Sequence, residues 1–310
     1  MNVFTMESLA VLGFVGVGLA WRWIRWLPAS EQVRGIIAGA VFTAFLPALT
    51  FRSMVLHAPV GSVLWKIPLI AALSISVALV GGWLFLRRPG WSAPRRAALL
   101  LAAAFGNVTY LGIPILSAVV GVDRTFVAVL YDFAASTPLL WTLGVGVIAL
   151  LTADTVSIQN VGRRLLVLPP LWAAGAGLLW QVIVGQQLPP LLDHLSAFAG
   201  ALVIPLMMFV LGLSLRWEYL RRWRELVGVA ILKLLVVPAV ALMAALLLGL
   251  DNRTACATVL EAGMPTMMLV LVVAERFALD SEAVASAIVV TTLASAATLP
   301  LWWYLASIIT

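Results

Sequence analysis

The sequence predicts an all-α integral membrane protein with ten transmembrane helices. Hydrophobic residues make up 63% of the 310 residues and charged residues only 10%, whereas soluble domains are about a quarter charged. A helix needs about 20 apolar residues to cross a hydrocarbon core roughly 30 Å thick, so a chain of this length with short loops holds about ten spans. Long apolar runs and basic clusters in alternate loops support the same fold class.

The apolar runs and the residues that interrupt them place each helix, with boundaries good to about four residues. The helices are expected at residues 3–21, 33–52, 62–86, 97–120, 125–150, 162–184, 191–215, 225–249, 253–274 and 282–308.

Basic residues concentrate in the connections that follow the odd-numbered helices. These connections contain Arg22, Arg25, Arg34, Arg87, Arg88, Arg95, Arg96, Arg163, Arg164, Arg216, Arg221, Arg222, Arg224 and Arg276. Short loops rich in arginine and lysine stay in the cytoplasm, so both termini are expected outside it.

The charge and cysteine content argue against several other classes of protein. The net charge of +6 lies in short arginine clusters between apolar runs, which is typical of membrane orientation and not of nucleic-acid binding. Cys256 is the single cysteine, and His57 and His194 lie far apart in the sequence, so neither a disulfide framework nor a metal site is expected. We expect no cofactor.

Helix-breaking and acidic residues recur in the two halves of the chain at a spacing of 157 or 158 residues. The pairs are Pro47 and Pro205, Gly106 and Gly263, and Asp123 and Asp280. Five spans per half is an odd number, so the second half enters the membrane inverted, a plan found in many secondary transporters. The expected organisation is a first five-helix repeat over residues 1–150, a short cytoplasmic linker over 151–162 and an inverted second repeat over 163–310.

Helices four and nine both contain glycine and proline in mid-span. Proline removes a backbone donor and glycine permits unwound backbone, so both helices are expected to break near the bilayer centre. A break is tolerated there only inside protein or beside a cavity, and half-helix amino termini suit an anionic group. The expected substrate-binding residues are Gly106, Asn107, Gly112, Pro114, Gly263, Met264 and Pro265. The alternative is a pair of proline kinks that bind no ligand.

Polar residues in the spans offer further candidates. Asn107 can hold a carboxylate or satisfy backbone groups freed by the break. Asp132, Lys233 and Glu261 are ionisable groups at membrane depth, which are costly and usually mark transport pathways. Any coupling to H⁺ or Na⁺ is expected at Glu261 or Asp132, while Asp132 and Lys233 can instead form a structural ion pair.

Two sequence blocks resemble the auxin efflux carrier family, the bacterial relatives of the plant PIN transporters. The blocks are Gly106-Asn107 with Leu111-Gly112-Ile113-Pro114 and Gly121, and Met264-Pro265 with Ala274-Glu275-Arg276-Phe277 and Leu279-Asp280. The resemblance implies two inverted five-helix repeats, in which helices four and nine cross at their breaks and move against a scaffold of helices one, two, six and seven. It also implies that Asn107, Pro114 and Pro265 lie at the crossing.

Together these features predict a secondary carrier of a small organic anion, such as a carboxylate or an auxin-like acid, and not an enzyme. It is expected in the bacterial inner membrane, with the bilayer and the anion as its partners and a homodimer left open. One alternative is a sodium-coupled bile-acid-type or an arsenite-type carrier of related fold. A distant alternative is an intramembrane aspartyl protease, because Tyr131-Asp132 resembles half of that signature, but the chemistry needs a second aspartate in the membrane.

Overall fold

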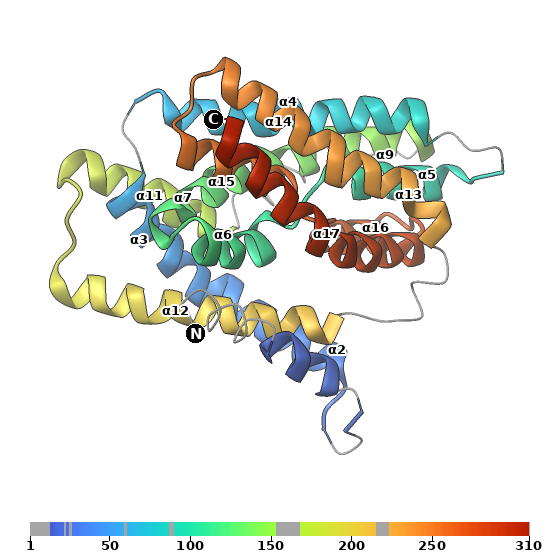
Figure 1. Ribbon diagram of the computed structural model, residues 1–310. Helices are drawn as coiled ribbons and strands as arrows, with labels where there is room; N and C mark the ends of the chain where they lie inside the picture. Colours follow the sequence, from blue (N-terminus) through green and yellow to red (C-terminus); the bar gives the residue numbers. More distant parts are fainter. Residues whose placement is uncertain are drawn as a thin grey trace. The chain divides into compact units, whose positions relative to one another are not determined.

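The computed structural model shows a chain that is helical in nearly all the segments that it describes (Figure 1). The described residues are 13–21, 23–24, 27–58, 61–86, 90–152, 168–214 and 223–309. Among them the only β-type pairing is an isolated bridge between Gly106 and Thr266. The all-α class is therefore confirmed, whereas residues 3–12 of the expected first helix and 153–162 of the expected linker lie outside the described residues.

The chain divides into two compact units, and each takes segments from both halves of the sequence. Unit 1 contains Met1–Pro59, Ile113–Val129 and Leu166–Leu215, and unit 2 contains Val60–Gly112, Leu130–Leu165 and Arg216–Thr310.

Unit 1 is built from the described helix at residues 13–21 and from helices of three chain segments. These are α2 (Ser30–Ala40), the π-helical turn η1 (Val41–Phe45), α3 (Leu46–His57), α6 (Ile113–Val119), the 3-10 turn η3 (Val122–Arg124), most of α7 (Thr125–Tyr131), α11 (Pro169–Ile183) and α12 (Pro190–Ser214).

Unit 2 holds the other described helices, including both pieces that flank the second expected break. These are α4 (Val63–Phe85), α5 (Ala93–Ala104), η2 (Val108–Gly112), η4 (Asp132–Ser136), α8 (Thr137–Leu139), η5 (Leu140–Gly144), α9 (Val145–Thr152), α13 (Trp223–Ile231), η7 (Leu232–Val236), α14 (Val237–Leu247), α15 (Asn252–Ala262), α16 (Met268–Arg276) and α17 (Ser281–Ile309).

Within the described residues, six continuous helices are long and apolar enough to cross a membrane. They are Ser30–His57, Val63–Phe85, Val122–Thr152, Pro190–Ser214, Trp223–Leu247 and Ser281–Ile309. These correspond to expected helices two, three, five, seven, eight and ten. Expected helices four and nine are each divided into two shorter pieces, so neither qualifies by length.

Four of the spans contain a π-helical turn that ends two residues before a proline. The turns η1, η2, η4 and η7 precede Pro47, Pro114, Pro138 and Pro238. Proline has no N–H and its ring crowds the carbonyl four residues earlier, which a locally widened turn accommodates. At η7 the carbonyl of Leu234, four residues before Pro238, accepts a hydrogen bond of 2.7 Å from the indole Nε1 of Trp302. The buried carbonyl therefore keeps a donor.

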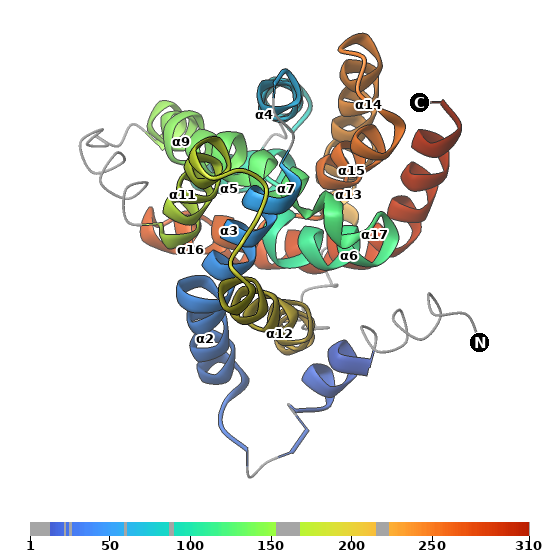
Figure 2. The same cartoon turned by 90° about the vertical axis from the view of Figure 1, so that its left-hand side faces the viewer.

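Very close helix contacts hold unit 1 together. α12 packs along α2 and α3, and α11 packs on α3 (Figure 2). A methyl group placed on Gly18 would lie 2.3 Å from the backbone oxygen of Phe209, and one placed on Gly212 would lie 2.2 Å from that of Val15. Helix 13–21 and α12 thus meet backbone to backbone, which only glycine permits.

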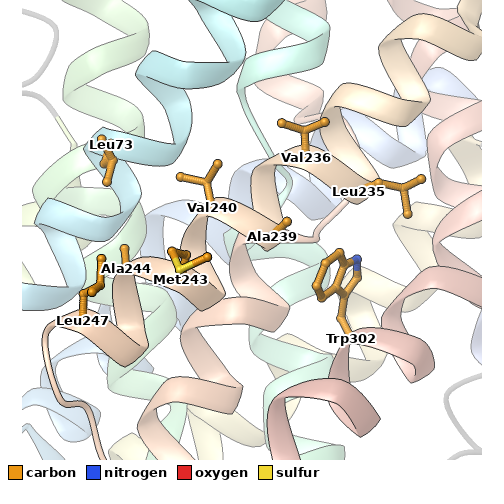
Figure 3. A pocket seen from close by; sticks show the side chains of 9 residues that line it. All are labelled: Leu73, Leu235, Val236, Ala239, Val240, Met243, Ala244, Leu247 and Trp302. Carbon is orange, nitrogen blue, oxygen red and sulfur yellow. The ribbon is translucent and has the colours of Figure 1, made fainter. Parts of the chain in front are cut away.

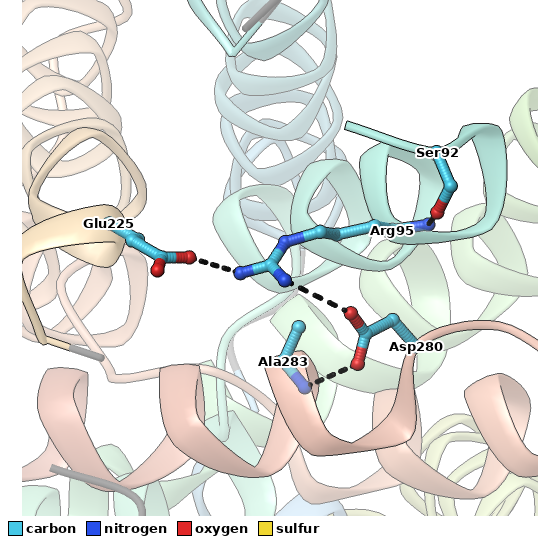
Figure 4. Close-up of polar contacts among 5 residues, drawn as sticks. All are labelled: Ser92, Arg95, Glu225, Asp280 and Ala283. Atoms are coloured by element: carbon cyan, nitrogen blue, oxygen red, sulfur yellow. Dashed lines mark hydrogen bonds and ion pairs between the residues drawn. The ribbon is translucent and has the colours of Figure 1, made fainter. Parts of the chain in front are cut away.

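An ion-pair cluster joins three helix starts of unit 2 (Figure 4). The guanidinium of Arg95, near the start of α5, pairs with Glu225 of α13 and, at 3.5 Å, with Asp280. The other carboxylate oxygen of Asp280 accepts the backbone N–H of Ala283 at 2.9 Å and so caps α17. These contacts fix the starts of α5, α13 and α17 relative to one another.

Candidate functional site

The site begins with two short interruptions of the helices in unit 2. α5 ends at Ala104 and the chain becomes extended at Phe105, with φ −102° and ψ 123°, before helix resumes at Val108. α15 ends at Ala262, is followed by Gly263, and helix resumes at Met268. Both expected breaks are present, and the first is shorter than the run from Gly106 to Pro114 suggested.

The two interruptions pair with each other as a miniature antiparallel sheet. The N–H of Asn107 donates to the carbonyl of Pro265 at 2.7 Å, and the N–H of Met267 donates to the carbonyl of Phe105 at 2.9 Å. Gly106 and Thr266 form the bridge between them. Backbone groups that are unwound at membrane depth need hydrogen-bond partners inside the protein. Here the backbone groups of each break bond to those of the other break.

Side chains cap the helix ends that point at this crossing. The hydroxyl of Thr266 donates to the carbonyl of Ala102 in α5 at 2.8 Å, and the ammonium of Lys233 donates to the carbonyl of Ala262 in α15 at 2.6 Å. A cation at a helix carboxyl terminus is favoured by the helix dipole. Lys233 is 1% exposed and Thr266 is fully buried, so both caps lie inside the protein.

Gly106 in the first break and Gly112 at the end of η2 allow two buried charges from the second half of the chain to approach closely. A methyl group on Gly106 would lie 3.1 Å from the ammonium nitrogen of Lys233. One on Gly112 would lie 2.3 Å from a carboxylate oxygen of Glu261. Lys233 and Glu261 are also near enough to interact electrostatically. The expected site residues Gly106, Gly112, Lys233 and Glu261 are therefore brought together.

Asp132, the third buried charge, is held by two threonine hydroxyls. Thr109 donates to one carboxylate oxygen, and Thr137 donates to the other at 2.7 Å. Asp132 is 2% exposed. In the part of the chain that the structure describes, no ion pair within 4.0 Å joins Asp132 to Lys233, so the alternative of a structural pair between them is wrong.

Asn107 is an expected substrate-binding residue whose side-chain amide is not used by the protein in its described residues. Its backbone is fully used: the N–H binds Pro265, and the carbonyl accepts the N–H groups of Leu111 and Gly112 at 3.2 and 3.1 Å. The residue is 3% exposed. Its side-chain amide forms no hydrogen bond with any other described residue, so the interpretation that this amide satisfies the broken backbone is wrong.

The other expected site residues occupy less direct positions. Gly263 is the C-cap of α15, and Met264 is fully buried within the second break. Pro114 lies in α6, beyond the unwound stretch. The widened turn η2 before it accommodates the backbone hydrogen bond that proline cannot donate. Asp251, the possible second aspartate of a protease, is exposed and caps the start of α15 by accepting the N–H of Thr254 at 3.1 Å. The buried aspartate pair that the protease alternative requires is therefore not formed.

Threonines are the site residues that the sequence analysis missed. Thr109 and Thr137 bind Asp132, Thr266 caps α5, and the hydroxyl of Thr291 accepts the N–H of Thr266 at 3.0 Å. Two of them could have been found by their proximity in sequence to expected site residues, since Thr137 follows Asp132 by little more than one turn and Thr266 adjoins Pro265. No sequence feature pointed to Thr291, because its partner Thr266 is distant in sequence.

Replacing Thr266 with valine is expected to destabilise the protein by about 1 to 3 kcal/mol, because the buried carbonyl of Ala102 loses its side-chain donor. Thermal or denaturant unfolding of the purified protein in detergent measures the change. Thr298→Val is the matched control, since the hydroxyl of Thr298 has no hydrogen-bond partner in the described residues. The control should stay within about 0.5 kcal/mol of wild type. Equal losses in both variants would contradict the capping role.

Comparison with known proteins places this geometry in a family. The family model described as "membrane transport protein" matches residues 4–303. The chain belongs to this family. It is the family of the auxin efflux carriers, so the resemblance seen in the two sequence blocks is confirmed. This chain is 31% identical to an uncharacterized transporter of Methanothermobacter thermautotrophicus over 303 residues, which cover 96% of this chain and 97% of the relative.

A second relative of this chain is an uncharacterized transporter of Methanocaldococcus jannaschii. It is 26% identical over 215 residues, 67% of each chain. The family match and the apolar helices together show a membrane transporter.

An apolar groove elsewhere in unit 2 differs from the crossing in chemistry. It has a volume of about 660 Å³ and is lined along η7 and α14, with Leu73 contributed by α4 and Trp302 by α17 (Figure 3). Every lining side chain is apolar apart from the indole N–H of Trp302, which is bonded to Leu234. The groove offers nothing to hold an anion, so the polar crossing remains the candidate substrate site.

Proposed function

We propose that the protein is a secondary carrier of a small organic anion, such as a carboxylate or an auxin-like acid, and not an enzyme. Its site is the crossing of the two broken helices. The observation that carries this proposal is Asn107, a residue that is 3% exposed and lies where the two breaks meet. Its side-chain amide has no hydrogen-bond partner among the described residues, so it can bind a ligand.

The charges around the crossing favour an anion. The amide nitrogen of Asn107 can donate two hydrogen bonds to a carboxylate. Lys233 adds a positive charge beside Gly106. The amino termini of η2 and α16 add partial positive charge, as in other carriers with discontinuous helices.

A two-fold relation between the two halves of the site would be consistent with alternating access. Asn107 and Pro265 bond to each other and are separated by 158 residues, the spacing already found between Pro47 and Pro205. Equivalent positions of two inverted repeats would meet in this way on a two-fold axis. The described helices of unit 1 include α2, α3, α11 and α12, which belong to the set that the family resemblance assigns to the scaffold.

We therefore keep the plan of ten helices in two inverted repeats, residues 1–150 and 163–310, joined by a short cytoplasmic linker. The protein is proposed to lie in the bacterial inner membrane with both termini outside the cytoplasm. Transport would proceed by rocking or elevator-like alternating access around the crossing.

A thermal-shift screen of small mono- and dicarboxylates on the purified protein tests this function. A carboxylate that binds the folded state should raise the apparent melting temperature, with a stabilisation of about 2.7 kcal/mol at 100 times its Kd. Matched alcohols and amines of the same carbon skeleton serve as controls. A rise with the amines, and none with any carboxylate, would overturn the assignment of an anionic substrate.

A further inference from the structure

Glu261 is a fully buried carboxyl group at the crossing that lacks a hydrogen-bond partner. It is 0% exposed. Neither of its oxygens has a hydrogen-bond partner among the residues that the structure describes. Instead the carboxyl packs against the backbone of Gly112 at the end of η2, where a methyl group would lie 2.3 Å from one of its oxygens.

The other two buried charges differ from Glu261 in this respect. Asp132 accepts hydrogen bonds from Thr109 and Thr137 on separate oxygens, as an ionised carboxylate does. Lys233 donates to the carbonyl of Ala262 at 2.6 Å, as an ammonium group does. Both environments suit the charged form, whereas the surroundings of Glu261 offer a carboxylate no donor.

An ionised carboxylate without donors costs several kcal/mol at membrane depth, and a neutral carboxylic acid costs much less. The charged or titratable groups around it are Lys233 of η7, Asp132 of η4, Tyr131 of α7 and, beside Asp132, Tyr110 of η2. The neighbouring α14 has no ionisable residue. The groups on α4 and α17 lie toward the ends of those helices and are Lys66, Glu282 and Tyr304.

We propose that Glu261 is the coupling residue, which binds one proton and releases it once in each transport cycle together with one substrate carboxylate. This inference rests on the proposed function. The O–H bond of the neutral acid breaks and the proton passes to water on the side to which the site is open. Rebinding a proton restores the neutral acid.

Coupling follows from competition for a single positive charge. When Glu261 is neutral, no carboxylate competes for the positive charge of Lys233, and the substrate carboxylate can interact with it. When Glu261 is ionised, it competes for that field and repels the substrate, because like charges at close range in a low dielectric disfavour each other. Proton and anion therefore bind together, and a proton gradient can drive the anion.

Infrared difference spectroscopy tests the proton site without knowledge of the substrate. The wild-type protein should show the C=O stretch of a buried carboxylic acid at neutral pH, and this band should disappear at alkaline pH. The band should be absent in Glu261→Gln and retained in the control Glu275→Gln, which changes an exposed carboxyl of α16. Gly112→Ala should shift the band, since its methyl group displaces the carboxyl. A wild-type spectrum without the band, or a band that survives in Glu261→Gln, would overturn the proposal.

Proteoliposomes containing labelled malonate as the probe test the coupling. An imposed pH gradient should drive malonate accumulation by wild type and by Glu275→Gln. Glu261→Gln should show no malonate accumulation driven by the pH gradient, and any malonate exchange that it retains should not depend on pH. Accumulation that follows a sodium gradient and ignores the pH gradient would overturn the proposal. Absence of all malonate movement with a normal infrared band would count against malonate transport by the proposed carrier and leave the proton site standing.

Discussion

Asn107→Ala is expected to reduce carboxylate transport about tenfold or more while leaving the folded protein in the membrane. The variant removes the available amide at the crossing and keeps the backbone bond to Pro265, which does not involve the side chain. A hydrogen bond to a charged group is worth about 1.5 to 3 kcal/mol, and each 1.4 kcal/mol is about a factor of ten in affinity. Uptake by proteoliposomes and the carboxylate-induced thermal shift should both fall.

Asn252→Ala provides the matched control. Asn252 is exposed at the start of α15, in the same half of helix nine as Glu261, and its amide donates to the carbonyl of Ser307 at 3.3 Å. Its loss should leave transport unchanged. Undiminished transport by Asn107→Ala, with the variant folded and inserted, would remove Asn107 from the substrate site and withdraw the main support for the proposed function.

Gly18→Ala is expected to have the largest effect on stability. The new methyl group would lie 2.3 Å from the backbone oxygen of Phe209 and 2.9 Å from the Cα of Gly212. Backbone atoms cannot rotate away as a side-chain end can, so helix 13–21 and α12 must separate. Overpacking typically costs about 1 to 3 kcal/mol and sometimes more. The melting temperature in detergent and the yield of inserted protein measure this loss.

Gly16→Ala, two residues earlier on the same helix, should have the opposite sign. Nothing lies within 4 Å of a methyl group placed there. Alanine has a helix propensity about 1 kcal/mol better than glycine, although tertiary context often overrides it. Similar destabilisation by both variants would show that the backbone contact at Gly18 is not what holds these helices together.

Much of the fold could be predicted because the signals are local. Apolar runs of span length and their breakers located α4, α12, the span Trp223–Leu247 and α17 to within a few residues, since lipid exposure leaves few other ways to arrange such runs. Helix two extended further than expected, to His57 in place of residue 52. Arg52 did not end it, because its guanidinium pairs with Asp193 of α12 at 2.7 Å.

The site was less predictable because its geometry depends on residues distant in sequence. Glycine and proline indicated that helices four and nine break, but not that the breaks bond to each other. Whether Lys233 would pair with Asp132 or cap α15 could not be decided from spacing, because a π-helical turn rotates every later side chain on its helix. Both residues lie in such turns, Asp132 in η4 and Lys233 in η7.

The bridge between Gly106 and Thr266 has a consequence for how the substrate specificity of such a carrier can change. Its two hydrogen bonds join main-chain atoms alone, from Asn107 to Pro265 and from Met267 to Phe105. The platform therefore does not depend on which side chain projects from position 107. The same fold can therefore bind a new substrate after substitution of a few side chains at the crossing, while the main-chain pairing that positions them stays unchanged.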